Sequence, residues 1–338
     1  MSNPTLPAST GISTPVSTRN RAADIFGSIM RVREIFMVIL ILIMGIAMSI
    51  LSPYFLDVGN FLAMARGFSM EGLVVVGMSL LLVAGKFDLS VGSIMALSGI
   101  VAAMLIRTGQ VPYVVAVLGG LGVGLLSGTI NGHVVTRIKV NPLIATLGMM
   151  SVARGVALGV TEGRPVINIP ADFAFIGQGS VLGVPLIIIY MVVIVLIADV
   201  LLRRGRAFRQ LYYVGSSEKA ARLSGINVDR VVFLAYIGSG VLTALAGVIS
   251  MARLTSGVPT AFAGVELRII AACVIGGMSL SGGEGTIIGA ILGLIFMALV
   301  TNALTLFGVS IYWEGVVTGT ILTAAVSFDM LSRRRLKA

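Results

Sequence analysis

Long apolar runs separated by short polar segments fill most of this 338-residue chain. The runs are continuously apolar instead of alternating, which indicates helices and not the strands of a membrane barrel. An apolar helix of about 20 residues crosses the roughly 30 Å hydrocarbon core of a bilayer. The pattern therefore predicts an all-α, polytopic membrane helix bundle with about ten transmembrane helices, and at least eight. The predicted spans are 35–51, 72–84, 91–106, 112–130, 143–160, 184–202, 231–250, 267–280, 285–304 and 312–331.

The basic residues predict how these spans are oriented. With the N-terminus inside, the inner segments hold 18 Lys and Arg residues and the outer segments hold four. Such an excess is typical of the cytoplasmic side, so both termini are predicted to be cytoplasmic. The first 18 residues are rich in Ser, Thr and Pro and lack the apolar core of a signal peptide. We therefore expect a disordered cytoplasmic tail at 1–30, a single transmembrane domain at 31–332 and a basic cytoplasmic tail at 333–338.

Composition supports the membrane interpretation and excludes several kinds of site. The chain is 57% hydrophobic and 11% charged, and its mean hydropathy of +1.04 lies outside the range of soluble domains. The single cysteine, Cys273, lies inside an apolar run, and the single histidine, His133, has no neighbouring ligand residues. We therefore predict no disulfide, no metal site and no enzymatic activity for this chain.

The string LSGGEG at 280–285 resembles the signature loop of ABC-type ATPases. An ATPase also needs a phosphate-binding loop of the form G-x-x-x-x-G-K-[ST]. The only Gly-Lys pair, Gly85-Lys86, is followed by Phe87, and Leu80 stands where the first glycine should be. The string is thus predicted to be a glycine-rich turn between two spans.

The largest hydrophilic segment, 203–230, contains a short predicted helix at 217–225. Ser216 or Ser217 can cap its start, Glu218 lies in its first turn, and Gly225 can end it. The neighbouring Ala220 and Ala221 have small side chains, so one face of the helix has no protruding groups. Such a face suits close docking of another protein. The alternative is a solvated basic loop that only follows the charge rule.

Four polar residues at or near span ends are candidates for a solute path or gate. Asp88, beside Ser90, can accept hydrogen bonds from its own turn and start the third span, which would be a structural role. A contact with the solute is the functional alternative, because ionisable groups at membrane depth often lie on pathways. Asn131 can form a hydrogen bond between helices. Glu266 lies two residues from Arg268, so the two need partners elsewhere.

Several strings resemble the sugar-type permeases of ABC importers, similar to those for ribose, xylose and arabinose. AGKFDLSVGS at 84–93 is similar to a G-x-x-D-L-S-V-G-S string of that family, and ELRIIAACVIGGMSLSGGEGT at 266–286 is similar to a second stretch. The A-A-x-x-x-G spacing from Ala220 resembles the coupling-loop pattern of ABC importer permeases. Further matches extend the resemblance from about residue 35 to 330. The chain departs from the family pattern at Lys86, Lys219 and Arg268.

The resemblance implies a membrane permease subunit of an ABC importer for a monosaccharide or sugar-like solute in the bacterial inner membrane. It implies three partners: an ATPase subunit that binds ATP and Mg²⁺, a periplasmic sugar-binding protein, and a second permease copy or a paralogue. This chain itself would bind no cofactor. The residues expected to couple it to the ATPase are Gly215, Glu218, Ala220, Ala221, Arg222 and Gly225.

Two other functions fit parts of the sequence. An importer for branched-chain amino acids or nucleosides would have a related permease. An ion-coupled secondary transporter would need a buried carboxylate or a broken helix near the middle of the membrane. The carboxylates are predicted to lie at span ends, which disfavours that class.

Overall fold

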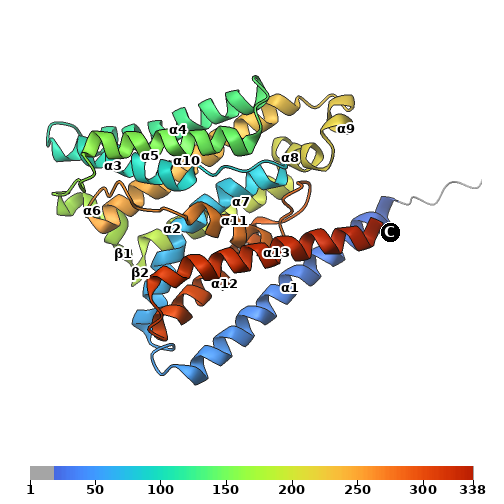
Figure 1. Ribbon diagram of the computed structural model, residues 1–338, viewed down its shortest axis with the longest axis horizontal. Coiled ribbons are helices and arrows are strands. Elements are labelled where there is room, and N and C mark those ends of the chain that lie inside the picture. The colour runs from blue at the N-terminus through green and yellow to red at the C-terminus, as the bar shows by residue number, and fades with distance from the viewer. Residues whose placement is uncertain (1–18, 338) are drawn as a thin grey trace, which may run out of the picture.

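The computed structural model describes residues 19–337, with side chains described for 34–310 and 312–327. The regular secondary structure of this part of the chain is almost all helical, as predicted (Figure 1). The helices are α1 (Arg19–Leu51), α2 (Val58–Val83), α3 (Val91–Arg107), α4 (Tyr113–Thr136), α5 (Pro142–Thr161), α6 (Ala171–Gln178), α7 (Leu186–Arg204), α8 (Arg206–Ser216), α9 (Glu218–Leu223), α10 (Val228–Leu254), α11 (Val265–Ile275), α12 (Ile287–Leu306) and α13 (Glu314–Lys337). A short hairpin, β1 (Ser180–Val181) and β2 (Val184–Pro185), precedes α7, and the 3-10 turn η1 (Ile311–Trp313) precedes α13.

Each of the ten predicted spans coincides with a helix, but their lengths differ. Seven helices of the described chain are long and apolar enough to cross a membrane. The helix α11 has 11 residues, and at 1.5 Å per residue it cannot cross a core of about 30 Å. Gly276 caps its end, and glycines with positive φ at Gly277, Gly282, Gly283 and Gly285 shape the turn that follows. The predicted span 267–280 is therefore a half-helix followed by a non-helical turn at 276–286.

The helix α2 begins earlier than the apolar run that predicted it. Asp57 caps it by accepting a hydrogen bond from the backbone of Asn60 at 3.2 Å. Polar residues in its first half lower the local hydropathy, so the sequence pattern detects only the part from residue 72 onwards. Glu71 consequently lies in the middle of a 26-residue helix. The prediction that the carboxylates lie at span ends is wrong for this residue.

The helix α10 forms the centre of the bundle and contacts α2, α3 and α4. Small residues let its backbone touch that of α4. A Cβ added at Gly124 would lie 2.1 Å from the Gly240 oxygen, and one added at Gly240 would lie 2.3 Å from the Gly124 oxygen. Such close approach is typical of membrane helices, which associate through packing and not through the hydrophobic effect.

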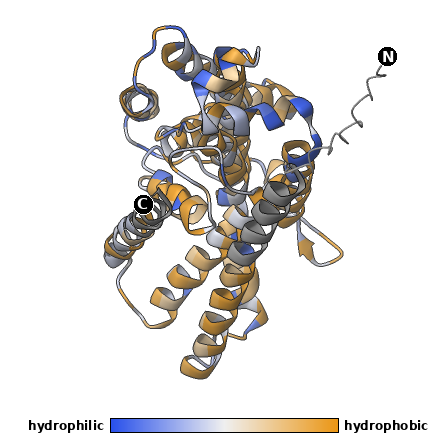
Figure 2. Ribbon diagram, turned by 90° about the vertical axis from the view of Figure 1, so that its right-hand side faces the viewer, coloured by the Kyte–Doolittle hydropathy of each residue, from blue (hydrophilic) through white to orange (hydrophobic). Residues whose placement is uncertain are grey.

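The outer surface of the bundle is apolar, as expected for a surface that contacts lipid. Ile50 on α1, Leu118 on α4 and Leu196 on α7 are all more than half exposed. Figure 2 shows largely hydrophobic helices, with most of the hydrophilic segments in the upper part of the view. This agrees with the hydropathy pattern of the sequence.

The segments predicted to share the inner side lie together at one end of the bundle. Lys86 pairs with Glu218 at 2.7 Å, and Lys139 pairs with Asp229 at 2.6 Å. The hydroxyl of Thr286 donates to Glu34 at 2.7 Å. The start of α1 and the end of α13 lie at this end, and the β1–β2 hairpin and α6 lie at the other (Figure 1).

The two predicted tails are partly helical. The helix α1 begins at Arg19 and α13 continues to Lys337, so both helices extend into the ranges 1–30 and 333–338. Residues 1–18 and 338 lie outside the described residues.

Candidate functional site

The segment 203–230 folds into two short helices at the end of the bundle that carries the predicted inner loops. The helix α9 confirms the predicted one: the Ser217 hydroxyl accepts a hydrogen bond from the backbone of Ala220 at 3.2 Å, and Gly225 follows with a φ of +79°. The preceding α8 was not predicted. Its signal in the sequence is the spacing of Leu211 and Val214, which are both buried and three residues apart on one helix face.

The two alanines of α9 point in different directions. Ala221 is 3% exposed and packs into the core of this chain, whereas Ala220 is exposed. Leu223, on the same helix, is 82% exposed. The two alanines expected to meet another protein thus lie on different sides of the helix, and only the part around Ala220 is accessible from outside.

Gly215, at the end of α8, lies against two other segments of the chain. A Cβ at Gly215 would lie 1.9 Å from the oxygen of Val83 and 2.4 Å from the nitrogen of Gly283. The Gly283 N–H also donates to the Val83 oxygen at 2.8 Å. The end of α2, the end of α8 and the 276–286 turn therefore meet backbone to backbone. We call this contact the glycine junction.

Gly85 and Gly282 complete the glycine junction. A Cβ at Gly282 would lie 2.7 Å from the Gly85 Cα and 2.9 Å from the Gly215 Cα, and both Gly85 and Gly282 have a positive φ. Glycine is required here because it alone tolerates both the close approach and the left-handed conformation. The predicted turn in LSGGEG is confirmed, and its glycines make this contact.

Two side chains reinforce the glycine junction. The Tyr212 hydroxyl donates to the Gly285 oxygen at 2.8 Å, and Lys86 pairs with Glu218 of α9. Burial raises the pKa of Tyr212 to about 12, so the hydroxyl remains protonated and can donate at neutral pH. The sequence marked Lys86 only as a departure from a family pattern and gave no signal for Tyr212.

Arg222 is held by an ion pair within the chain. Its guanidinium donates to Asp229 at 2.7 Å, and the Asp229 carboxylate also accepts a hydrogen bond from the Lys139 ammonium at 2.6 Å. The hydrogen bond with Asp229 raises the pKa of Arg222. These contacts link α9 to the start of α10 and to the turn between α4 and α5.

The structure brings Asp88, Ser90 and Asn131 together in the core. Asp88 accepts hydrogen bonds from the Ser90 backbone at 2.8 Å and from the Ser90 hydroxyl. Asn131 of α4 donates to Asp88 at 3.3 Å and to the Ser90 oxygen at 3.1 Å. All three are at most 1% exposed. The cluster fixes the turn before α3 to α4, which fits the structural interpretation of Asp88.

Glu266 lies apart from this cluster. It accepts a hydrogen bond from the Gly264 backbone at 3.2 Å at the start of α11, and a Cβ at Gly92 would lie 2.7 Å from its carboxylate. Arg154 of α5 donates to the Pro259 and Ala261 oxygens of the loop before α11. In the described part of the chain, no three His, Cys, Asp or Glu side chains come together as a metal site.

A second charged cluster, the charged triad, was missed by sequence reasoning. Arg268 of α11 pairs with Glu71 of α2 and with Glu314 of α13. The Thr301 hydroxyl also donates to Glu314 at 3.3 Å. The three charged side chains are mostly buried, between 16% and 24% exposed. The expectation that Arg268 needs partners from other helices is confirmed.

Comparison with known proteins identifies similar sequences. The family described as "Branched-chain amino acid transport system / permease component" matches residues 60–326. The ribose import permease protein RbsC of Bacillus subtilis is 40% identical over 85% of this chain and 89% of its own length. Two Escherichia coli proteins are similar over 90% of their own lengths: the D-allose transport permease AlsC at 36% identity and the L-arabinose transport permease AraH at 35%. No solved structure matches the chain.

Proposed function

Because the chain belongs to the branched-chain amino acid transport system / permease component family, we propose that it is the membrane subunit of an ABC importer that carries a monosaccharide into the cell. The observation that supports a sugar is the set of relatives at 35–40% identity, whose names specify ribose, D-allose and L-arabinose. In this proposal the chain performs no bond chemistry. ATP and Mg²⁺ bind to a partner subunit, and this chain needs no cofactor.

In this proposal the ATPase docks on α8 and α9. Ala220 and Leu223 are exposed on α9, and α8 presents Tyr213, which is half exposed. A motion imposed on these helices would reach α2 and the 276–286 turn through the glycine junction. Segments that touch backbone to backbone, without intervening side chains, must move together, since close-packed elements transmit displacement.

Three partners complete the proposed importer. They are an ATPase subunit, a sugar-binding protein outside the membrane, and a second permease copy or a paralogue. The binding protein would supply much of the sugar selectivity. The predicted sidedness places the glycine junction in the cytoplasm, where an ATPase can reach α8 and α9.

The test is uptake by the assembled importer in proteoliposomes, with the cognate ATPase and binding protein. We expect ATP-dependent accumulation of ribose, D-allose or L-arabinose. Leucine is the informative alternative substrate, because the family description names branched-chain amino acids. ATP-dependent uptake of leucine without uptake of any of the three sugars would contradict the proposal and favour an amino-acid importer.

A further inference from the structure

We propose that a pocket between α11 and α13 is a contact site for the transported solute, a neutral polyhydroxylated molecule, with Arg268 and Glu314 as its polar contacts. The inference rests on the proposed function. The pocket has a volume of about 350 Å³, and its lining includes Gly264, Arg268, Glu314, Gly315, Thr318 and Gly319. Small-molecule sites begin at about this size, roughly 300 Å³.

The charged triad gives the pocket donors and acceptors side by side. Arg268 has five N–H donors, two of which reach Glu71 and Glu314. Its Nε is buried and has no hydrogen-bond partner among the described residues, so a solute can be reached only by the N–H groups that remain on the two terminal nitrogens. A sugar hydroxyl both donates and accepts, so a pair of neighbouring hydroxyls can contact a guanidinium and a carboxylate together. The paired charges suit a neutral solute, because a charged one would compete with these ion pairs.

The glycines keep the pocket open. A Cβ added at Gly264, Gly315 or Gly319 would meet nothing within 4 Å. The open space in front of these residues lets a ring approach the helix backbone. Larger side chains at Gly315 or Gly319 would fill this space without a clash inside the chain, which makes the pocket testable by substitution.

The pocket lies within the depth of the bundle. Arg268 is in the first turn of α11, and Glu314 begins α13. Arg268 also pairs with Glu71, which does not line the pocket but lies near the middle of α2. Charged side chains at such depth are costly and are found on solute and ion pathways. The ion pair with Glu71 therefore holds Arg268 between the two ends of the bundle, where a transported molecule must pass.

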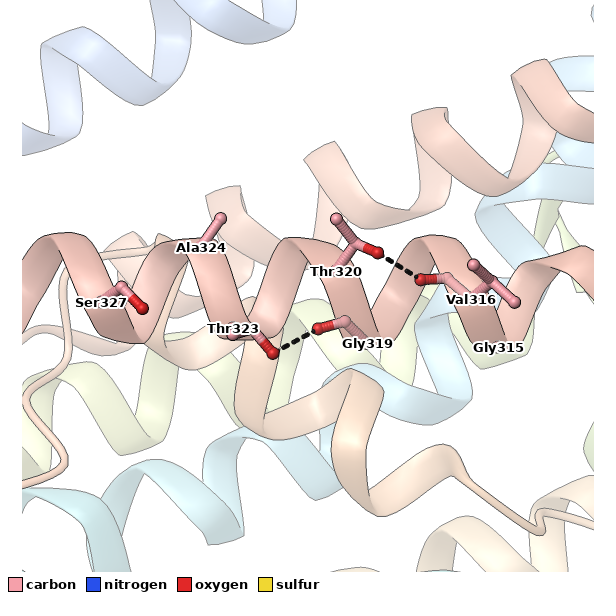
Figure 3. Close-up of a pocket in the computed structure, with 7 residues that line it drawn as sticks. All are labelled: Gly315, Val316, Gly319, Thr320, Thr323, Ala324 and Ser327. Atoms are coloured by element: carbon pink, nitrogen blue, oxygen red, sulfur yellow. Dashed lines mark hydrogen bonds between the residues drawn. The ribbon is translucent and has the colours of Figure 1, made fainter.

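A shallow groove continues from the pocket along α13 (Figure 3). Gly315 and Gly319 line both, and the groove has a volume of about 590 Å³. The hydroxyls of Thr320 and Thr323 donate to backbone oxygens of their own helix at 2.8 and 2.9 Å. Their oxygens can still accept hydrogen bonds. The groove leads from the charged triad towards the end of α13 that lies on the α8–α9 side (Figure 1).

The experiment uses the assembled importer in proteoliposomes and measures KM and kcat for ribose, D-allose and L-arabinose. Glu314→Gln keeps the shape of the side chain and removes its charge. We expect it to raise KM roughly tenfold or more for at least one sugar, because a hydrogen bond to a charged group is lost. We expect kcat to change less. Gly319→Leu fills the pocket and should lower uptake of the hexose D-allose at least tenfold more than uptake of the pentose ribose.

The matched control is Gly155→Leu on α5. A Cβ at Gly155 also meets nothing within 4 Å, but this residue does not line the pocket. It should leave uptake and sugar preference unchanged. An unchanged KM in Glu314→Gln together with an unchanged sugar preference in Gly319→Leu, with normal assembly, would overturn the site while leaving the proposed function intact. Failure of the unmodified importer to take up any of the three sugars would instead reject the proposed function, and the site with it.

A labelling measurement covers the case in which Glu314→Gln does not assemble. Gly319→Cys is reacted with a water-soluble thiol reagent in the assembled importer, where the natural Cys273 is buried. We expect labelling that transported sugar slows, and uptake that labelling blocks. No labelling would overturn the site. Loss of assembly in Gly319→Leu but not in Gly155→Leu would also overturn it, because a second permease copy would then cover this face.

Discussion

The glycine junction and the charged triad both join three segments of the bundle, but they do so in different ways. At the glycine junction, α2, α8 and the 276–286 turn touch through bare backbone, and no side chain fits between them. At the charged triad, α2, α11 and α13 are held by three long charged side chains beside a pocket. Direct backbone contact suits the transmission of movement, whereas long side chains leave room for a solute.

The two contacts share the helix α2 and the segment from α11 to the 276–286 turn. Glu71 lies near the middle of α2, and Val83 at its end contacts the glycine junction. Arg268 lies in the first turn of α11, and Gly283 lies in the turn that follows this helix. In the proposed mechanism, a displacement at the α8–α9 end therefore reaches the pocket along two paths. Separate changes at each contact test whether the two have different roles.

The largest effect is expected for Arg268→Gln. It leaves Glu71 and Glu314 mostly buried without their counter-charge, and breaking such a pair costs about 3–5 kcal/mol. We expect a strong loss of thermal stability and of abundance in the membrane. The double variant Arg268→Gln, Glu71→Gln removes one of the two uncompensated charges and should recover much of the stability. Equal abundance of the single variant and the unmodified protein would show that the triad is not needed for folding.

The next effect is expected for Gly215→Ala. The new methyl group would lie 1.9 Å from the Val83 oxygen, so the segments must separate, at a cost of about 1–3 kcal/mol for overpacking. We expect reduced thermal stability and ATP hydrolysis that no longer drives uptake. Gly148→Ala is the control, because a Cβ there meets nothing within 4 Å. Full uptake by Gly215→Ala would remove the glycine junction from the coupling path.

A smaller effect is expected for Tyr212→Phe, which removes one hydrogen bond to Gly285 and about 1 kcal/mol of stability. Uptake per ATP should fall, and binding of the ATPase should remain. The pH dependence distinguishes the hydroxyl from the ring. Because burial raises the pKa of Tyr212 to about 12, the bond contributes fully below the ordinary value near 10 and is lost towards pH 12. Thermal stability of the two proteins should therefore differ by a constant amount from pH 6 to 9.

Hydropathy predicted where the membrane helices lie in the chain, because an apolar run in lipid must satisfy its backbone as a helix. It misplaced the start of α2, since Asn60, Arg66 and Glu71 lower the local hydropathy of a helix that other helices bury. It also treated 267–280 as a continuous span, although its glycines end the helix at Ile275. Local spacing can mark a cap or a helix face, but it cannot show which helix lies opposite.

The candidate residues show the same limit. Capping chemistry is local, so the roles of Ser217 and Gly225 could be read from sequence. The charged triad joins residues 71, 268 and 314, which are distant in the chain, and no local pattern links them. The inward direction of Ala221 also depends on the packing of α9 against the core. The importance of Ala220 and Ala221 for coupling remains a prediction.

The smallest effect on the stability of this chain is expected for Ala220→Glu, and this variant tests docking most directly. Ala220 is exposed, so an added carboxylate remains in water, and surface changes of this kind alter stability by about 0.5 kcal/mol or less. Ala221→Glu cannot serve, because Ala221 is buried in this chain and the charge would disrupt its own core.

If the ATPase covers α9, Ala220→Glu places an unpaired charge in a desolvated contact, which costs several kcal/mol, roughly 3–5 for a buried ion without its partner. Co-purification of the ATPase and sugar uptake should then be lost while membrane abundance and melting temperature stay unchanged. Lys219→Gln is the matched control, because it alters the charge of the neighbouring exposed residue without adding a carboxylate. Normal co-purification and uptake with Ala220→Glu would show that this face of α9 stays in solvent, and would leave α8 as the surface through which the ATPase must act.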